Sequence, residues 1–208
     1  MTASQVDLTI EVRSGDGSNT EFYQNDPKLL ARALRVLVTP RLFTQPFLVL
    51  ASEHNVSTIP CRTIDLILAR TAAPVQLAWP AELLDVSELC EPGLDNEPEE
   101  AETGFSGPMH TPAPVTTSHL EIQTLGAWTV ALTVQAVAQA TVHDERQLLM
   151  HFFDLPVLPF RLQGSGVGFI NPSRISRVTV HPAFNAPSEA LPADLLRSSP
   201  PFQRGVRL

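Results

Sequence analysis

Cysteine is scarce in this chain of 208 residues, which contains only Cys61 and Cys90. Two cysteines are too few for a disulfide scaffold, and their separation does not match a metal-binding knuckle. Long apolar runs are absent as well, since none approaches the roughly 18–20 residues that a membrane-spanning helix needs. Residues 1–12 carry neither a basic patch nor an apolar stretch of the kind found in signal peptides. These absences favour a protein of the reducing cytoplasm without a membrane partner.

Positive charge is sparse and comes almost entirely from arginine, because Lys28 is the single lysine among 14 basic residues. The sequence has no dense basic face, and its aromatic residues do not alternate with basic ones. A nucleic-acid partner is therefore not expected. This preference for arginine, together with abundant alanine, leucine and proline, is typical of proteins from GC-rich bacterial genomes.

Negative charge is concentrated in the middle of the chain. Residues 71–118 contain nine Asp or Glu residues and no Lys or Arg, and seven of the 19 prolines fall there. The net charge of the whole chain is −8, so the remaining residues together carry +1. An acidic, proline-rich composition of this kind predicts a mostly irregular linker between two nearly neutral folded regions.

The two regions that flank the acidic stretch resemble each other. Residues 47–68 align without a gap on residues 158–179, and both contain two apolar runs separated by a polar break. Upstream of this match, each region has four apolar residues at the spacing of one helical face. These are Leu29, Leu30, Ala33 and Leu34 in the first region and Leu148, Leu149, Phe152 and Phe153 in the second. Because the elements recur in the same order, the sequence predicts an internal duplication.

The expected fold class is α+β, with two tandem ββαββ-like modules whose antiparallel sheets pack as a pseudo-symmetric pair. Each module should contain one main helix. The first helix has a strong start signal, since Asp26 can cap it and Pro27 suits its first position. The second should begin at Thr141 or Asp144. The expected organisation is a first module at 1–70, a linker at 71–118, a second module at 119–182 and an extended Pro- and Arg-containing tail at 183–208.

One segment of the linker, WPAELLDVSEL at 79–89, is predicted to form a short amphipathic helix that begins at Pro80. A helix of about ten residues is not stable alone in water. This segment should therefore dock either on its own modules or on a protein partner. Its candidate partner-binding residues are Trp79, Leu83, Leu84 and Leu89.

No set of residues forms a convincing catalytic or metal-binding pattern. The glycine-rich residues 164–168 lie between two expected strands rather than before a helix, which favours a hairpin turn over a phosphate-binding loop. His143 and His151 lie more than two helical turns apart, too far to share one metal. Cys61 could pair with His54 as a nucleophile, although a small packed residue fits that position better. We therefore predict no catalytic residue, no metal and no cofactor.

The sequence leaves two hypotheses for the function. The first is a non-enzymatic protein-interaction or assembly module that binds a protein partner or associates with itself, for example as a homodimer. The alternative is a small-molecule-binding domain, which could be an enzyme, with its site at the junction of the two modules. If the modules pair about an axis, Asp65 and Arg177 could meet across it, and the alternative is an exposed role for both at a strand edge. The candidate binding residues at the junction are His54, Cys61, Arg62, Arg161 and Arg174.

Overall fold

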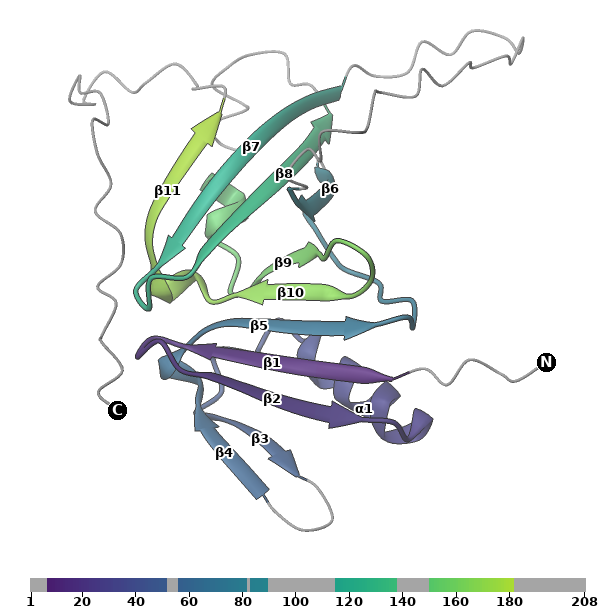
Figure 1. Cartoon of the computed structure of the whole chain (residues 1–208). Coiled ribbons are helices and arrows are strands. Elements are labelled where there is room, and N and C mark those ends of the chain that lie inside the picture. The colour runs from purple at the N-terminus through teal and green to yellow at the C-terminus, as the bar shows by residue number, and fades with distance from the viewer. Residues whose placement is uncertain (1–6, 52–55, 82, 90–114, 138–149, 182–208) are drawn as a thin grey trace, which may run out of the picture.

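The computed structural model of the protein describes residues 7–51, 56–81, 83–89, 115–137 and 150–181. These residues form helix α1 (Pro27–Leu37), two short 3-10 helices and a set of β-strands (Figure 1). The 3-10 helices are η1 (Cys61–Thr63) and η2 (Pro172–Arg174). The strands are β1 (Leu8–Ser14), β2 (Asn19–Gln24), β3 (Phe47–Ala51), β4 (Val56–Pro60), β5 (Ile64–Thr71), β6 (Leu83–Glu88), β7 (Val115–Thr124), β8 (Thr129–Val137), β9 (Leu158–Arg161), β10 (Val167–Ile170) and β11 (Ile175–His181).

Nine of these strands make one sheet, in the order β11-β7-β8-β6-β9-β10-β5-β1-β2. Strands β3 and β4 form a separate two-stranded sheet. The pairs are antiparallel except for a parallel contact between β6 and β9. The expected α+β class with antiparallel sheets is confirmed. No helix within the described ranges is long and apolar enough to span a membrane.

The start of helix α1 follows from local chemistry. The Asp26 carboxylate accepts hydrogen bonds from the backbone N–H of Lys28 at 2.7 Å and of Leu29 at 3.3 Å. Leu30, Leu34 and Leu37, spaced along one helical face, are buried against the sheet. The predicted helix start is therefore confirmed. Of the second predicted helix, only residues 150–153 are described, and they are helical; its expected start lies outside the described residues.

The cap gives a first testable expectation. Asp26→Ala should lower the free energy of unfolding by about 1 kcal/mol, because two backbone N–H groups lose their acceptor. Urea denaturation followed by circular dichroism would measure the change. Asp26→Asn is the matched control, since asparagine is also a strong capping residue. Equal losses in the two variants would contradict the assigned role.

The chain has two halves, one from β1 to β5 and one from β7 to β11. Each half contains a three-stranded unit with the same pairing. Strand β1 lies between β2 and β5, and β7 lies between β8 and β11. The turn after β1 includes Gly17 with φ of 82°, and the turn after β7 includes Ala127 with φ of 63°. The ladder to the third strand shifts register beside Ser14 in one unit and beside Ile175 in the other. Both units therefore have the same order and a similar irregularity.

The β9–β10 hairpin joins the two halves edge to edge. Strand β10 pairs antiparallel with β5, from Val167 opposite Ala69 to Ile170 opposite Leu66. In Figure 1 this hairpin lies between β5 on one side and the β6, β7, β8 and β11 group on the other. The predicted turn at residues 164–166 is present, with positive φ at Gly164 and Gly166. A Cβ at Gly166 would collide with the Ala69 carbonyl oxygen, so this loop sits directly on β5.

The predicted helix at 79–89 is wrong, because Leu83–Glu88 form strand β6 inside the large sheet. Leu83 and Val86 are buried three positions apart, a spacing that resembles a helical face. The physical cause is a register shift between Leu83 and Asp85 in the ladder with β8, which places both side chains on one face of the sheet. The expected linker is also shorter than predicted, since β7 begins at Val115. Residues 90–114 lie outside the described residues.

The buried side chains form two clusters, and each combines residues from both halves. The first cluster includes Phe152, Phe160 and Leu132, together with Leu66 and Leu68 from strand β5. The second contains the inner faces of β1 and α1, and strand β10 contributes Val167 and Phe169 to it. The two halves therefore share their cores.

Candidate functional site

A buried ion pair marks the junction between the two halves. Asp65, at the start of β5, is fully buried. Its Oδ1 accepts a hydrogen bond from Arg174 Nε at 2.8 Å, and its Oδ2 accepts one from the Gly126 backbone N–H at 2.6 Å. Arg177, the expected partner, instead contacts Glu121 at 3.0 Å, so that expectation is wrong. The carboxylate is thus held by donors from two different elements of the second half.

The turns around this pair pack closely. A Cβ at Gly126 would lie 2.5 Å from Asp65 Oδ2 and 2.7 Å from the Ser14 carbonyl oxygen, so only glycine fits there. Trp128 Nε1 donates to the Ser14 carbonyl at 3.0 Å. The guanidinium of Arg13 lies 4.9 Å from the centroid of the Trp128 ring. The polar groups of this junction are paired with each other across the two halves, so the contacts stabilise the association of the halves.

The candidate binding residues make separate contacts. Arg161 pairs with Asp85 at 2.9 Å and lies over the Trp79 ring, whereas Arg174 is held by Asp65. Arg62 is exposed on η1. His54 lies outside the described residues. Arg174 lies at the junction of the two halves, where its partner is a buried carboxylate.

Cys61 is the fourth described candidate, and it is buried beside the junction. Its Sγ donates to the Leu42 carbonyl at 3.4 Å, and burial raises the pKa of its thiol. A raised pKa lowers the fraction of thiolate, which is the nucleophilic form. These features fit a packed residue, the interpretation that the sequence favoured.

The reactivity of Cys61 can be measured directly. In a Cys90→Ser background, Cys61 should react with a thiol reagent at about pH 7.5 far more slowly in the folded protein than in urea, because it is buried and protonated. The matched control adds Thr58→Cys, which places a second thiol on the exposed face of β4 and should be labelled rapidly. Rapid labelling of native Cys61 would contradict the assignment.

Segment 79–89 docks on its own chain, one of the two alternatives left open by the sequence. Trp79 Nε1 donates to the Pro159 carbonyl at 3.0 Å, and Leu83 is buried in the first core cluster. Leu84 and Leu89 are exposed. Trp79 and Leu83, two of the candidate partner-binding residues, therefore anchor this segment in cis.

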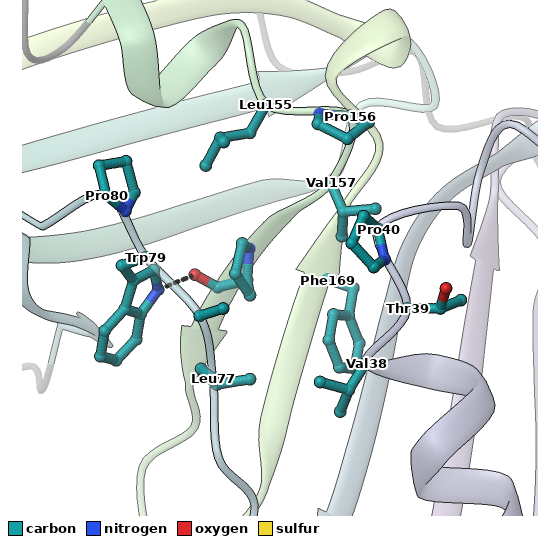
Figure 2. A pocket seen from close by; sticks show the side chains of 12 residues that line it. Val38, Thr39, Pro40, Leu77, Trp79, Pro80, Leu155, Pro156, Val157 and Phe169 are labelled. Atoms are coloured by element: carbon teal, nitrogen blue, oxygen red, sulfur yellow. Dashed lines mark hydrogen bonds between the residues drawn. The ribbon is translucent and has the colours of Figure 1, made fainter.

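A cavity of about 320 Å³ lies between the two halves. Its walls come from residues 38–40 just after α1, the segment 77–80, residues 155–157, Pro159 and Phe169 (Figure 2). None of these lining residues has an ionisable side chain, and none of the four described binding candidates is among them. The cavity would accept an apolar group rather than a charged one.

The β3–β4 hairpin has an exposed apolar face that the sequence reasoning missed. Its inner face is anchored by Leu48, which is 2% exposed. On the outer face Phe47 is 50%, Val49 56% and Val56 66% exposed, and the pairing Ala51–Val56 brings the two strands' outer side chains together. Contiguous exposed apolar side chains mark interaction surfaces. The signal in the sequence was the run FLVLA, which lacks the polar alternation of a strand with one solvent-facing side.

Unpaired strand edges are a second feature that could bind a partner. Within the described residues, β4 is paired only with β3, and β11 is paired only with β7. Unpaired strand edges present rows of backbone N–H and C=O groups that can accept another strand.

Comparison of the chain with protein-family models, with curated proteins and with solved structures found no match in any of the three. In the part of the chain that the structure describes, no group of three or more His, Cys, Asp or Glu side chains could hold a metal ion. The function is therefore inferred from the surfaces of this chain.

Proposed function

We propose that the protein is a non-enzymatic protein-interaction or assembly module, and that the outer face of the β3–β4 hairpin is its interaction surface. The observation that carries this proposal is the exposure of Phe47, Val49 and Val56 on one face of a two-stranded sheet. Covering apolar surface stabilises a complex by about 25 cal/mol per Å² removed from water. A face of this kind favours a bound partner over contact with solvent.

We also infer that the chain contains two copies of one folding unit, which supports this function. Arg13 lies opposite Asn19 in β1 and β2, and Gln123 lies opposite Thr129 in β7 and β8, with the same separation along the chain in both pairs. Ser14 N–H donates to Ser18 O at 2.9 Å, and Thr124 N–H donates to Trp128 O at the same distance. Equal registers and equal turns are expected of duplicated hairpins.

The second hairpins of the two halves correspond in a similar way. Ala51 lies opposite Val56 in β3 and β4, and Arg161 lies opposite Val167 in β9 and β10. The loop of the β9–β10 hairpin is longer by a single position, so the predicted ungapped alignment of 47–68 on 158–179 needs a one-residue gap in this loop. The alignment continues without a further change from β4 and β10 onward. The 3-10 helix η1 follows β4 directly, η2 follows β10 after Asn171, and each leads into the last strand of its half.

The two equivalent hairpins differ in what covers their outer faces. Val56 is 66% exposed, whereas its counterpart Val167 is 2% exposed. Thr58 is exposed, and its counterpart Phe169 is 1% exposed within the core of the first half. The β9–β10 hairpin already uses this face to pack against the other half of the chain. The first hairpin has the same surface without a cover in the described residues, which supports a role in binding.

The test compares wild-type protein with Val49→Lys, which places a charge in the middle of the outer face. Light scattering after size-exclusion chromatography and capture of proteins from a lysate are the two measurements. We expect the wild type to self-associate or to retain proteins that Val49→Lys loses. Leu125→Lys changes another exposed apolar residue and should behave as the wild type. A wild-type protein that is monomeric at every concentration and retains nothing would overturn the proposal.

The second candidate function is the binding of an apolar small molecule, which the cavity between the halves favours. Its volume of about 320 Å³ suits a small ligand. The test is a thermal-shift measurement with medium-chain fatty acids as probes. A rise in Tm for the wild type that is lost in Ala78→Trp, which fills the cavity, would support this function, and the absence of any shift would remove it.

A further inference from the structure

We propose that the partner covering the β3–β4 hairpin is a second copy of this chain, whose strand β11 accepts β4 as its next antiparallel strand. The inference deepens the proposed interaction function and rests on it and on the duplication. It assigns both the partner and the register of the contact.

The template for this contact exists within each chain. Strand β10 pairs with β5 on the side opposite to β1, with Val167 facing Ala69 and Phe169 facing Ile67. This contact buries the outer face of the β9–β10 hairpin on the core of the first half. A hairpin of this unit therefore docks on the last strand of a neighbouring unit.

Strand β11 is the counterpart of β5 and lacks such a neighbour within the described residues. It pairs with β7 as β5 pairs with β1. Ile67 and Ala69 of β5 are fully buried, whereas their counterparts Val178 and Val180 are only partly buried. This difference is expected if the strand that should cover the edge of β11 comes from another molecule.

The hairpin and the acceptor strand of one chain do not meet. Strand β11 ends the large sheet, and β4 belongs to a separate sheet at the far side of the molecule (Figure 1). One chain thus offers a donor strand at one end and an acceptor edge at the other. The two surfaces differ, so the contact is heterologous, and its repetition from copy to copy gives either a closed ring or an open filament.

The register of the contact follows from the template when each residue is replaced by its counterpart in the other half. The pair Val167–Ala69 then becomes Val56 opposite Val180 of the second copy. In the same way, the pair Phe169–Ile67 becomes Thr58 opposite Val178 of the second copy. The most exposed apolar side chain of the hairpin would then lie beside an apolar side chain of the neighbouring strand.

The polar anchors of the template are absent from this contact. Asn171 donates from its backbone to Asp65 O at 2.9 Å, whereas its counterpart Pro60 has no N–H. The Arg174–Asp65 pair is replaced by Thr63 and Ser176. The contact between copies should therefore be weaker than the contact within a chain and should depend on protein concentration.

Disulfide formation between two chains tests the register. In a Cys90→Ser background, protein with Thr58→Cys is mixed with protein with Val178→Cys under mild oxidation. Residues directly opposite in an antiparallel pair have Cα atoms about 4.5–5.5 Å apart, within the range that a disulfide bridges. Ser57→Cys mixed with Val178→Cys is the control, because the adjacent side chain points to the other face of the hairpin. We expect the first mixture to give a covalent dimer with several-fold higher yield.

A second variant tests the contact without cysteine. Val56→Lys should shift the mass distribution in light scattering toward monomer at the same protein concentration. Val56 is exposed in the single chain, so this variant should fold normally. Leu125→Lys should keep the distribution of the wild type.

The outcomes separate this inference from the function on which it rests. One outcome is association that Val49→Lys abolishes, without a disulfide between Thr58→Cys and Val178→Cys. This outcome would overturn the proposed partner and register, but the protein would still be an interaction module. Cross-linking within one chain carrying both cysteines, without covalent dimer, would overturn the inference as well. Retention of a different protein by a monomeric chain would have the same meaning. A monomeric wild type that retains nothing would overturn both proposals.

Discussion

Arg174→Ala should lower the free energy of unfolding by about 3–5 kcal/mol, because it leaves a fully buried carboxylate without its countercharge. Asp65 would keep only the hydrogen bond from the Gly126 N–H, which is too little to compensate its desolvation. The pair also joins η2 to the start of β5, so the variant should loosen the junction of the two halves. Urea denaturation followed by circular dichroism would measure the loss.

The matched control for this prediction is Arg161→Ala. Arg161 also pairs with a carboxylate, but its side chain is 57% exposed. Exposed pairs contribute about 0–1 kcal/mol. Replacing the buried pair with two apolar residues, in Asp65→Leu with Arg174→Met, should recover part of the stability, since no buried charge remains unpaired. Equal losses in Arg174→Ala and Arg161→Ala would contradict the role assigned to the junction.

Phe169→Ala should lower the free energy of unfolding by a comparable amount, about 3–5 kcal/mol. Its ring comes from strand β10 and is buried in the core of the first half, opposite Ile67. Truncation would leave a cavity that the surrounding sheet can close only in part, because both strands are held by their ladders. Thermal and urea denaturation would both report the change.

The duplication that we infer supplies the control for Phe169→Ala. Thr58 occupies the equivalent position in β4 and is exposed, so Thr58→Ala should change the stability of a single chain by less than about 0.5 kcal/mol. A similar loss of stability in both variants would contradict the finding that Phe169 is buried and Thr58 is exposed.

Local signals predicted the fold best where the chain near one residue determines its structure. Asp26 and Pro27 specify the start of α1 because the cap acts on residues two and three positions away. The turn at 164–166 was predictable for the same reason, since glycine tolerates positive φ. The repeated order of elements also led to the α+β class.

Strand β6 shows where such reasoning fails. Buried residues spaced three apart predict a helix only if the backbone is regular, and the register shift after Leu83 produces the same spacing in a strand. No signal within residues 79–89 distinguishes the two cases. The sheet decides, because β8 offers an edge that Leu83–Glu88 can complete.

Long-range partners were the other limit. Asp65 was expected to meet Arg177, but the chain turns so that Arg174 reaches it first and Arg177 points toward Glu121. The exposed face of the β3–β4 hairpin was predictable only in part. The run FLVLA indicates apolar side chains on both faces of β3, but whether a face is covered depends on where the hairpin lies in the fold.

The Arg174–Asp65 contact joins residues 109 positions apart in the sequence, and this separation has a consequence for biosynthesis. While the ribosome is still making the second half, β5 of the nascent chain has no β10 beside it. Leu66 and Leu68, whose core neighbours come mostly from the second half, would face water during that time. Translation at about 5–20 residues per second leaves them exposed for several seconds. The unfinished chain should therefore need chaperones that the finished chain does not.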